Sequence, residues 1–234
     1  MPGRSRTARV SQRGFAQHVL ASPRLARELV AAARVEATDR VVELGGGTGV
    51  LTAAIAARAA HVLTIELDPK FVARLVRQFE RVATVTVIHG DALEVPLPST
   101  SYRVIANIPF NRTGAILRRL LDDPHGGLVR ADLVVQWQAA RARVEATDLL
   151  GATWGPWWMF ERGRRLPAAL FRPSPSVDAA MLTVTRRKHD LVPDEQRSLY
   201  TAFVRHEFER SSGPLERGVE TWVRQFRLRQ NARR

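Results

Sequence analysis

The 234-residue sequence has no cysteine, only two lysines, and no long apolar run. Without cysteine the chain can form neither a disulfide nor a thiolate zinc site, and the six histidines lack the spacing of metal ligands. No segment approaches the roughly 18 apolar residues of a membrane span, and the basic first residues precede no apolar core of a signal peptide. We therefore expect a cytoplasmic protein with no metal and no membrane partner.

Acidic residues are also scarce, since 23 Asp and Glu face 36 Lys and Arg and leave a formal charge of +13. Such a surplus favours a polyanionic partner. Nearly all of it is arginine, whose planar guanidinium suits phosphates and base edges. A GC-rich genome would explain the choice of arginine over lysine but not the net excess. Residues 1–14 are rich in arginine and predict a flexible basic arm that contacts nucleic acid, or else a disordered end without a role.

Short apolar strand patterns alternate with helical patterns through the first two thirds of the chain. Strands are predicted at 40–44, 61–67, 85–90, 102–108 and 131–138, and helices at 22–33, 49–59, 70–82 and 113–123. This alternation implies right-handed βαβ units and a mostly parallel, doubly wound α/β sheet. Ligands of such sheets bind at the carboxyl ends of the strands.

The pattern changes beyond residue 138. Residues 139–151 are expected to be helical, 153–166 are rich in aromatic residues, and 171–187 join a proline loop to a late strand. The three tryptophans of the aromatic segment could stack on RNA, although clustered tryptophans more often pack in a core. Residues 188–234 are helical and charged. We therefore predict a basic arm at 1–14, a main domain at 15–187 and a small helical C-terminal domain at 188–234.

A glycine-rich turn follows the first predicted strand, in "VVELGGGTGVLT" (41–52). Gly45, Gly47 and Gly49 stand between a strand and a helix, where glycine lets backbone N–H groups approach a ligand closely. The nicotinamide-dinucleotide fingerprint would place its third glycine at position 50, which is Val50. NAD is therefore disfavoured.

Three further polar residues fall at the ends of successive strands. Glu66 can accept both hydroxyls of a ribose, Asp91 can accept a hydrogen bond from an adenine amine, and Asn107 lies at the end of the fourth strand. Each acid alone could equally be a helix cap or a turn residue. In this order they outline a pocket for an adenosine with a small polar tail, and S-adenosylmethionine is the common ligand of that description.

The segments "ELGGGTGVLT", "IELD", "GDAL", "NIPF" and "FRPSPSV" together resemble the ribosomal RNA adenine N6-methyltransferases, and most closely the erythromycin-resistance (Erm) family. The resemblance runs from about Phe15 to Arg187. DNA adenine methylases carry two prolines in the tetrad that starts at Asn107, and housekeeping small-subunit dimethyltransferases typically read N-L-P-Y. Ile108 therefore favours the Erm family.

The resemblance implies a Rossmann-like class I methyltransferase sheet with a small C-terminal helical domain, and S-adenosyl-L-methionine as cofactor. The implied cofactor-binding residues are Gln17, His18, Val19, Gly45, Gly47, Gly49, Glu66, Leu67, Asp91, Ala92 and Asn107. The implied catalytic residues are Asn107, Ile108, Pro109, Phe110 and Phe171, with Phe171 flanking the target base opposite Phe110. His18 and Val19 differ from the usual Asn and Phe of the family, and Gln138 stands where related sequences tend to have Glu.

The tetrad residues suit methylation of an adenine amine, whose lone pair is delocalised into the ring. Asn107 can offer a side-chain oxygen and Pro109 a carbonyl, so that two acceptors hold the two N–H groups as positive charge develops. The target adenine must first leave the base stack of the RNA. Aromatic rings such as Phe110 and Phe171 would then replace the neighbouring bases on which it stacked.

The resemblance implies methylation of one adenine of 23S rRNA, with resistance to macrolides, by a monomer acting before the ribosome is fully assembled. Two alternatives stay open, a housekeeping 16S rRNA dimethyltransferase and a non-catalytic nucleic-acid-binding factor on the same fold. A DNA adenine methylase is disfavoured by the single proline of the tetrad. The sequence leaves the exact adenine and the number of methyl groups open.

Overall fold

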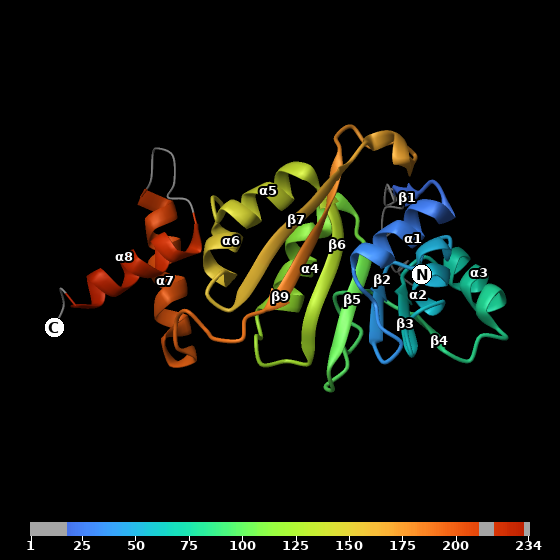
Figure 1. Ribbon diagram of the computed structural model, residues 1–234, viewed down its shortest axis with the longest axis horizontal. Helices are drawn as coiled ribbons and strands as arrows, with labels where there is room; N and C mark the ends of the chain where they lie inside the picture. Colours follow the sequence, from blue (N-terminus) through green and yellow to red (C-terminus); the bar gives the residue numbers. More distant parts are fainter. Residues whose placement is uncertain (1–17, 211–217, 232–234) are drawn as a thin grey trace, which may run out of the picture.

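The computed structural model describes residues 18–210 and 218–231 (Figure 1). The strands are β1 Val19–Leu20, β2 Arg40–Leu44, β3 His61–Glu66, β4 Val85–His89, β5 Tyr102–Asn107, β6 Leu128–Gln136, β7 Trp158–Leu166, β8 Phe171–Arg172 and β9 Ala179–Arg186. The helices are α1 Pro23–Ala32, α2 Val50–Ala56, α3 Pro69–Phe79, α4 Thr113–Leu121, α5 Trp137–Glu145, α6 Leu149–Trp154, α7 Arg197–Arg210 and α8 Val219–Asn231. The predicted arm at 1–14 and the predicted site residue Gln17 lie outside the described residues.

Seven strands form the main sheet, in the order β4-β3-β2-β5-β6-β9-β7. The five strands from β4 to β6 pair in parallel, whereas β9 runs antiparallel to both β6 and β7. β1 and β8 form a separate antiparallel ribbon. Figure 1 shows α3 and β4 at one end of the long axis and α7 and α8 at the other. The predicted α/β fold with a mostly parallel, Rossmann-like sheet is confirmed.

Capping side chains set where the helices beside the strand ends begin. Ser22 Oγ accepts a hydrogen bond from Leu25 N at 3.2 Å and so caps α1. Asp68 caps α3 by accepting from Lys70 N at 2.8 Å. Each cap satisfies a donor that the first helical turn leaves without a partner. α2 has no such side chain and begins directly after Gly49, which takes the left-handed conformation with φ 79°.

The C-terminal part of the sheet contains one strand that the sequence analysis does not predict. β7 lies at the edge of the sheet, and residues 161–165 are exposed there. Its pairing with β9 is irregular between Arg162 and Arg165. An exposed, interrupted edge strand lacks the alternation of apolar and polar residues by which strands are recognised.

Two predicted boundaries near residue 138 are also wrong. The strand predicted at 131–138 is β6, which begins and ends earlier, so Gln138 lies in α5. The single helix predicted at 139–151 is two helices, because Ala146 adopts φ 48° and ends α5. Left-handed backbone at a residue other than glycine is rarely visible in a sequence.

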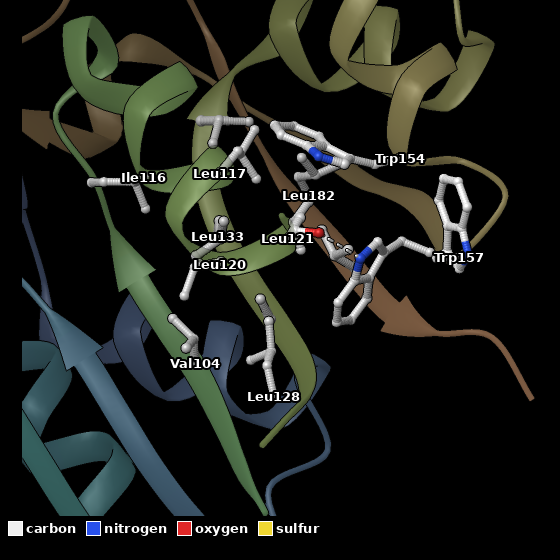
Figure 2. Packing of buried hydrophobic residues seen from close by; sticks show 14 of the residues in the cluster. Val104, Ile116, Leu117, Leu120, Leu121, Leu128, Leu133, Trp154, Trp157 and Leu182 are labelled. Atoms are coloured by element: carbon white, nitrogen blue, oxygen red, sulfur yellow. Dashed lines mark hydrogen bonds between the residues drawn. The ribbon is translucent and has the colours of Figure 1, made fainter. Parts of the chain in front are cut away.

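The tryptophan-rich segment lies in the core. Trp154, Trp157 and Trp158 are 4%, 2% and 1% exposed, and Trp158 Nε1 donates to Leu121 O at 3.1 Å. In Figure 2 the Trp154 ring lies next to Leu182, a residue of β9. The favoured interpretation of these tryptophans as core residues is confirmed, and an exposed RNA-stacking platform is excluded for them.

Helices α7 and α8 pack against the same core. Tyr200, Trp222 and Phe226 are buried and belong to the hydrophobic cluster that contains Trp157 and the inner face of the sheet. Tyr200 Oη donates to Ala152 O at 3.0 Å. The helices predicted beyond residue 188 are present, while a domain boundary at 187/188 stays a prediction. Within the described ranges, every helix is too short or too polar to serve as a membrane span.

Candidate active site

Four polar segments meet at one edge of the sheet. β4, β3, β2 and β5 are neighbours and run parallel, so their carboxyl ends lie side by side. Asp91 follows β4, Glu66 ends β3, the glycine turn follows β2, and Asn107 ends β5. The predicted clustering of these segments at the strand ends is therefore what the topology produces.

The glycine turn needs its glycines for two different reasons. Gly45 and Gly47 have φ of 84° and 52°, a region that side chains disfavour. A Cβ on Gly46 would lie 2.3 Å from Thr64 Oγ1, so this residue must be glycine for the turn to pack on β3. At Gly45 the backbone of the turn faces open space, because an added Cβ there would meet nothing within 4 Å.

Glu66 is a fixed acceptor at the centre of this edge. Its side chain is nearly inaccessible, with the residue 1% exposed. Oε2 accepts from Gly47 N at 2.8 Å, and Oε1 accepts from Leu67 N and Asp68 N, both at 2.8 Å. Three backbone donors therefore hold the carboxylate in one orientation and tie it to the glycine turn.

Glu43 is a buried acid that the sequence analysis does not assign. It belongs to β2, is 0% exposed, and accepts from Thr52 Oγ1 at 2.6 Å. Its Oε1 finds no hydrogen-bond partner among the described residues, although Glu43 lines the cleft. Burial, with a further contribution from the charge of Glu66, raises the pKa of Glu43 to about 8, although the side chains of Thr52 and Thr64 act to lower it. The signal in the sequence is a lone acid inside the apolar strand "RVVEL".

Asn107 is oriented by the chain segment that precedes β1. Its Nδ2 donates to His18 O at 2.6 Å, which turns Oδ1 to the opposite side of the amide as an acceptor. The His18 ring lies 5.6 Å from the Phe110 ring and bonds through Nδ1 to Pro173 O at 2.7 Å. The segment around His18 therefore connects the tetrad to the loop after β8.

The carbonyl of Pro109 is already used within the tetrad turn. Pro109 O accepts from Arg112 N at 2.9 Å, which closes the short 3₁₀ turn Phe110–Arg112. The carbonyl one residue earlier belongs to Ile108, whose side chain is buried at 2% exposure while the residue borders the cleft.

A narrow cleft, with a cavity volume of about 40 Å³, joins part of the predicted set. The predicted site residues that line it are His18, Val19, Gly45, Gly47, Asn107, Ile108 and Pro109. Glu66 reaches this lining through its bond to Gly47 N. Gly49, Leu67, Asp91, Ala92 and Phe110 lie outside the cleft lining.

Phe171 is fully buried and does not line the cleft. It is 0% exposed and packs in the cluster beneath α1, with its backbone paired to Leu20 in the β1–β8 ribbon. A ring buried to this extent cannot flank a base in this conformation. Its predicted stacking role therefore requires the ribbon to move, and it stays a prediction.

The arginines of α5 and β7, which the net charge suggests as phosphate contacts, have intramolecular partners. Arg141 pairs with Glu145, Arg143 with Asp148, Arg164 with Glu28, and Arg165 with Asp178. Arg162 instead lies over the Trp137 ring, with Cζ 4.1 Å from the centroid. The side chains of Arg141, Arg164 and Arg165 are largely exposed, whereas that of Arg143 is buried. Exposed ion pairs contribute only about 0–1 kcal/mol, so polyanion phosphates can compete for the three exposed arginines.

The chemistry of the site fits an adenosyl cofactor. The glycine turn offers an open backbone surface, and Glu66 offers a fixed carboxylate. Within residues 18–210 and 218–231, no three His, Asp or Glu side chains gather closely enough to hold a metal ion.

Comparison with known proteins identifies a family. The profile of the family described as "Ribosomal RNA adenine dimethylase" matches residues 9–233. An rRNA adenine N-6-methyltransferase of Corynebacterium diphtheriae is 38% identical over 166 residues, 70% of this chain and 64% of that protein. The mycinamicin-resistance protein MyrB of Micromonospora griseorubida is 36% identical over 199 residues, 80% of this chain and 63% of that protein. This chain thus spans less than two thirds of the length of either relative.

Among solved structures, the 23S rRNA methyltransferase ErmE superposes with a TM-score of 0.75 at 26% identity. The match covers 83% of this chain and 80% of that one. The order and direction of the strands described above are therefore those of a class I methyltransferase sheet.

Proposed function

This chain belongs to the ribosomal RNA adenine dimethylase family, and on that premise we propose that it is an S-adenosylmethionine-dependent rRNA adenine N6-methyltransferase of the Erm type. Its substrate is one adenine of 23S rRNA, and the modification protects the ribosome against macrolides. It acts in the cytoplasm as a monomer, on RNA that is not yet fully assembled into ribosomes. The relatives named for mycinamicin resistance and for 23S rRNA methylation support this choice of substrate.

The observation that carries the proposal is the orientation of Asn107. Because Nδ2 is bonded to His18 O, Oδ1 is the atom left to accept a hydrogen bond from a bound base. Asn107 lines the same cleft as the glycine turn, so an acceptor for an amine and a surface for an adenosyl group share one space. That combination suits transfer to an exocyclic amine.

The cofactor would be held by the turn Gly45–Gly49, by Glu66 at its ribose and by Asp91 with Ala92 at its adenine. Leu67 would contact the adenine ring, and His18 with Val19 would border the methionine end. When bound, the cofactor supplies an electrophilic methyl group on a sulfonium. Gln17 is assigned to the methionine end from the family resemblance alone.

The residues of the tetrad would hold the target amine. Asn107 Oδ1 accepts one N–H, and the second acceptor is a carbonyl of the tetrad, either that of Ile108 or the second lone pair of Pro109 O, whose first accepts Arg112 N. Two acceptors favour the pyramidal nitrogen and stabilise the positive charge that develops on it. Phe110 would stack on the extruded base, which is typically worth about 1–3 kcal/mol per base.

Transfer of a labelled methyl group to purified large- and small-subunit rRNA tests the proposal. We expect label in the large-subunit RNA and none after Asn107→Ala. Label confined to the small-subunit RNA would instead identify a housekeeping dimethyltransferase. Absence of label from both RNAs, with retained RNA binding, would identify a non-catalytic binding factor.

A further inference from the structure

Arg112 connects the tetrad to the acid assigned to the cofactor's adenine. Its backbone N donates to Pro109 O at 2.9 Å, within the turn that follows Asn107. Its side-chain Nη2 donates to Oδ1 of Asp91 at 3.0 Å and to Oδ2 at 2.9 Å. One residue therefore touches both the wall of the target-base site and the far end of the cofactor site.

The ion pair occupies both oxygens of Asp91. Oδ1 also accepts from Leu93 N at 2.8 Å, which leaves few free lone pairs for a further donor. Burial works to raise the pKa of Asp91, but the bonds from Leu93 and Arg112 and the charges of Arg112 and Arg119 hold it below its usual range. At neutral pH the carboxylate is ionised, and an adenine amine arriving there meets an acid that Arg112 already holds.

Breaking this ion pair would leave the turn that carries Asp91 in place. Arg119 of α4 donates to Leu93 O and Val95 O, and the backbone N of Val95 donates to Asp91 O at 2.9 Å. The side chains of Arg112 and Asp91 are 21% and 22% exposed, so water and phosphate can reach both. Arg112 can thus change partner while its backbone stays bonded to Pro109 O.

Resting on the proposed function, we propose that Arg112 is a positioning residue that couples the binding of cofactor to the binding of RNA. With the cofactor site empty, Arg112 pairs with Asp91. When an adenine amine takes a share of the Asp91 carboxylate, the guanidinium turns to a phosphate of the RNA segment that carries the target adenine. Cofactor and RNA then each raise the affinity for the other by the same factor.

A purely structural role for the pair makes the opposite prediction for the cofactor. If Arg112 only oriented Asp91, its removal would misplace the carboxylate and weaken cofactor binding. If Arg112 competes with the adenine, Arg112→Gln should leave cofactor affinity equal to that of the wild type or raise it severalfold. Arg112→Lys keeps the charge but not the two-oxygen geometry, and it should restore part of the coupling.

Calorimetric titration of the full chain with S-adenosylhomocysteine, with and without a synthetic RNA hairpin bearing one unpaired adenine, measures this coupling. We expect the hairpin to tighten binding of S-adenosylhomocysteine to the wild type about fivefold or more, at the low end of typical coupling factors. Arg112→Gln should reduce this factor to about one. Arg118→Gln removes the same charge from an exposed position of α4 and should keep the coupling.

The dependence of RNA affinity on salt provides a second readout. With S-adenosylhomocysteine present, Arg112→Gln should lower the slope of log affinity against log salt by about 0.7, the contribution of one phosphate contact to a single strand. Without S-adenosylhomocysteine, the variant and the wild type should show the same slope of log affinity against log salt.

Three results would overturn the inference. They are a wild type without coupling, an Arg112→Gln variant that keeps it, and an Arg112→Gln variant that binds S-adenosylhomocysteine more weakly than the wild type. Failure of the wild type to bind S-adenosylhomocysteine at all would instead overturn the proposed function.

Discussion

The two halves of the sheet use polar residues in opposite ways. At the ends of β4, β3, β2 and β5, acids and an amide face a cleft or its border, and Glu43 keeps an oxygen without a donor. Around β6, β9 and β7, aromatic side chains fill the core, and the indoles of Trp154, Trp158 and Trp222 donate to Asp122, Leu121 O and Ala146 O respectively. Trp157 Nε1, also in the second half, is buried without a partner among the described residues. The first half carries the polar groups that border the cleft, so changes there should affect activity, whereas changes in the aromatic second half should affect stability.

Asn107→Ala should produce the largest loss of activity in the first half. Removing one preorganised acceptor of a transition state costs about 10²–10³-fold in turnover, and here the bond that tethers His18 is lost as well. Methyl transfer to RNA and binding of S-adenosylhomocysteine should be measured on the same preparation. We expect affinity to change little, and a turnover within about threefold of wild type would disprove the acceptor role.

Trp222→Ala should produce the largest loss of stability in the second half. Trp222 is 1% exposed and stacks on Phe208 at 5.2 Å between ring centroids. Truncating a buried tryptophan typically costs about 3–5 kcal/mol. Urea denaturation should show this loss, while the fraction that stays folded keeps its turnover. The control is Leu228→Ala on the same helix. Leu228 is 63% exposed, so this substitution should change the free energy of unfolding by less than about 0.5 kcal/mol.

Replacing Glu43 with Gln should change how the stability of the protein depends on pH. Because burial raises the pKa of Glu43 from 4.5 to about 8, the folded protein loses stability relative to the unfolded chain as pH rises between these values. The variant lacks this titration. Its free energy of unfolding should therefore rise relative to that of the wild type, by up to about 1.4 kcal/mol per pH unit in that range. Denaturation at pH 5 and pH 8 measures the gap, and a gap that is the same at both values would contradict a neutral, buried Glu43.

Phe110→Ala should give the smallest of these effects. Loss of one aromatic stack costs about 1–3 kcal/mol and should appear in turnover on RNA, with cofactor affinity unchanged. Phe110→Tyr retains the ring and should stay close to wild type. If the alanine and tyrosine variants behaved alike, Phe110 would act in packing against His18 and not on the base.

The sequence predicts the half of the sheet that contains β4, β3, β2 and β5 better than the half that contains β6, β9 and β7, and for a physical reason. Parallel strands buried on both faces give apolar runs, and positive φ requires glycine, so β2, β5 and the turn Gly45–Gly49 are visible in the residue pattern. The edge strand β7 and the break at Ala146 depend on pairing and backbone geometry that the pattern does not carry.

Within the candidate site, the sequence predicts which residues are present but not which of them contact one another. The positions of Glu66, Asp91 and Asn107 at strand ends follow from topology. The pairing of Asp91 with Arg112, the tether from Asn107 to His18 O and the burial of Phe171 join segments far apart in the chain. Such contacts arise only once the strands and the β1–β8 ribbon are assembled.

Mass-spectrometric mapping of the methylated nucleoside in RNA treated with the purified protein tests the central claim most directly. The claim is that the cleft beside Asn107 methylates N6 of one adenine in 23S rRNA. We predict N6-methylated adenosine at a single position of 23S rRNA and unmodified RNA with Asn107→Ala. Methylation at another atom or another base, or confined to 16S rRNA, would contradict it.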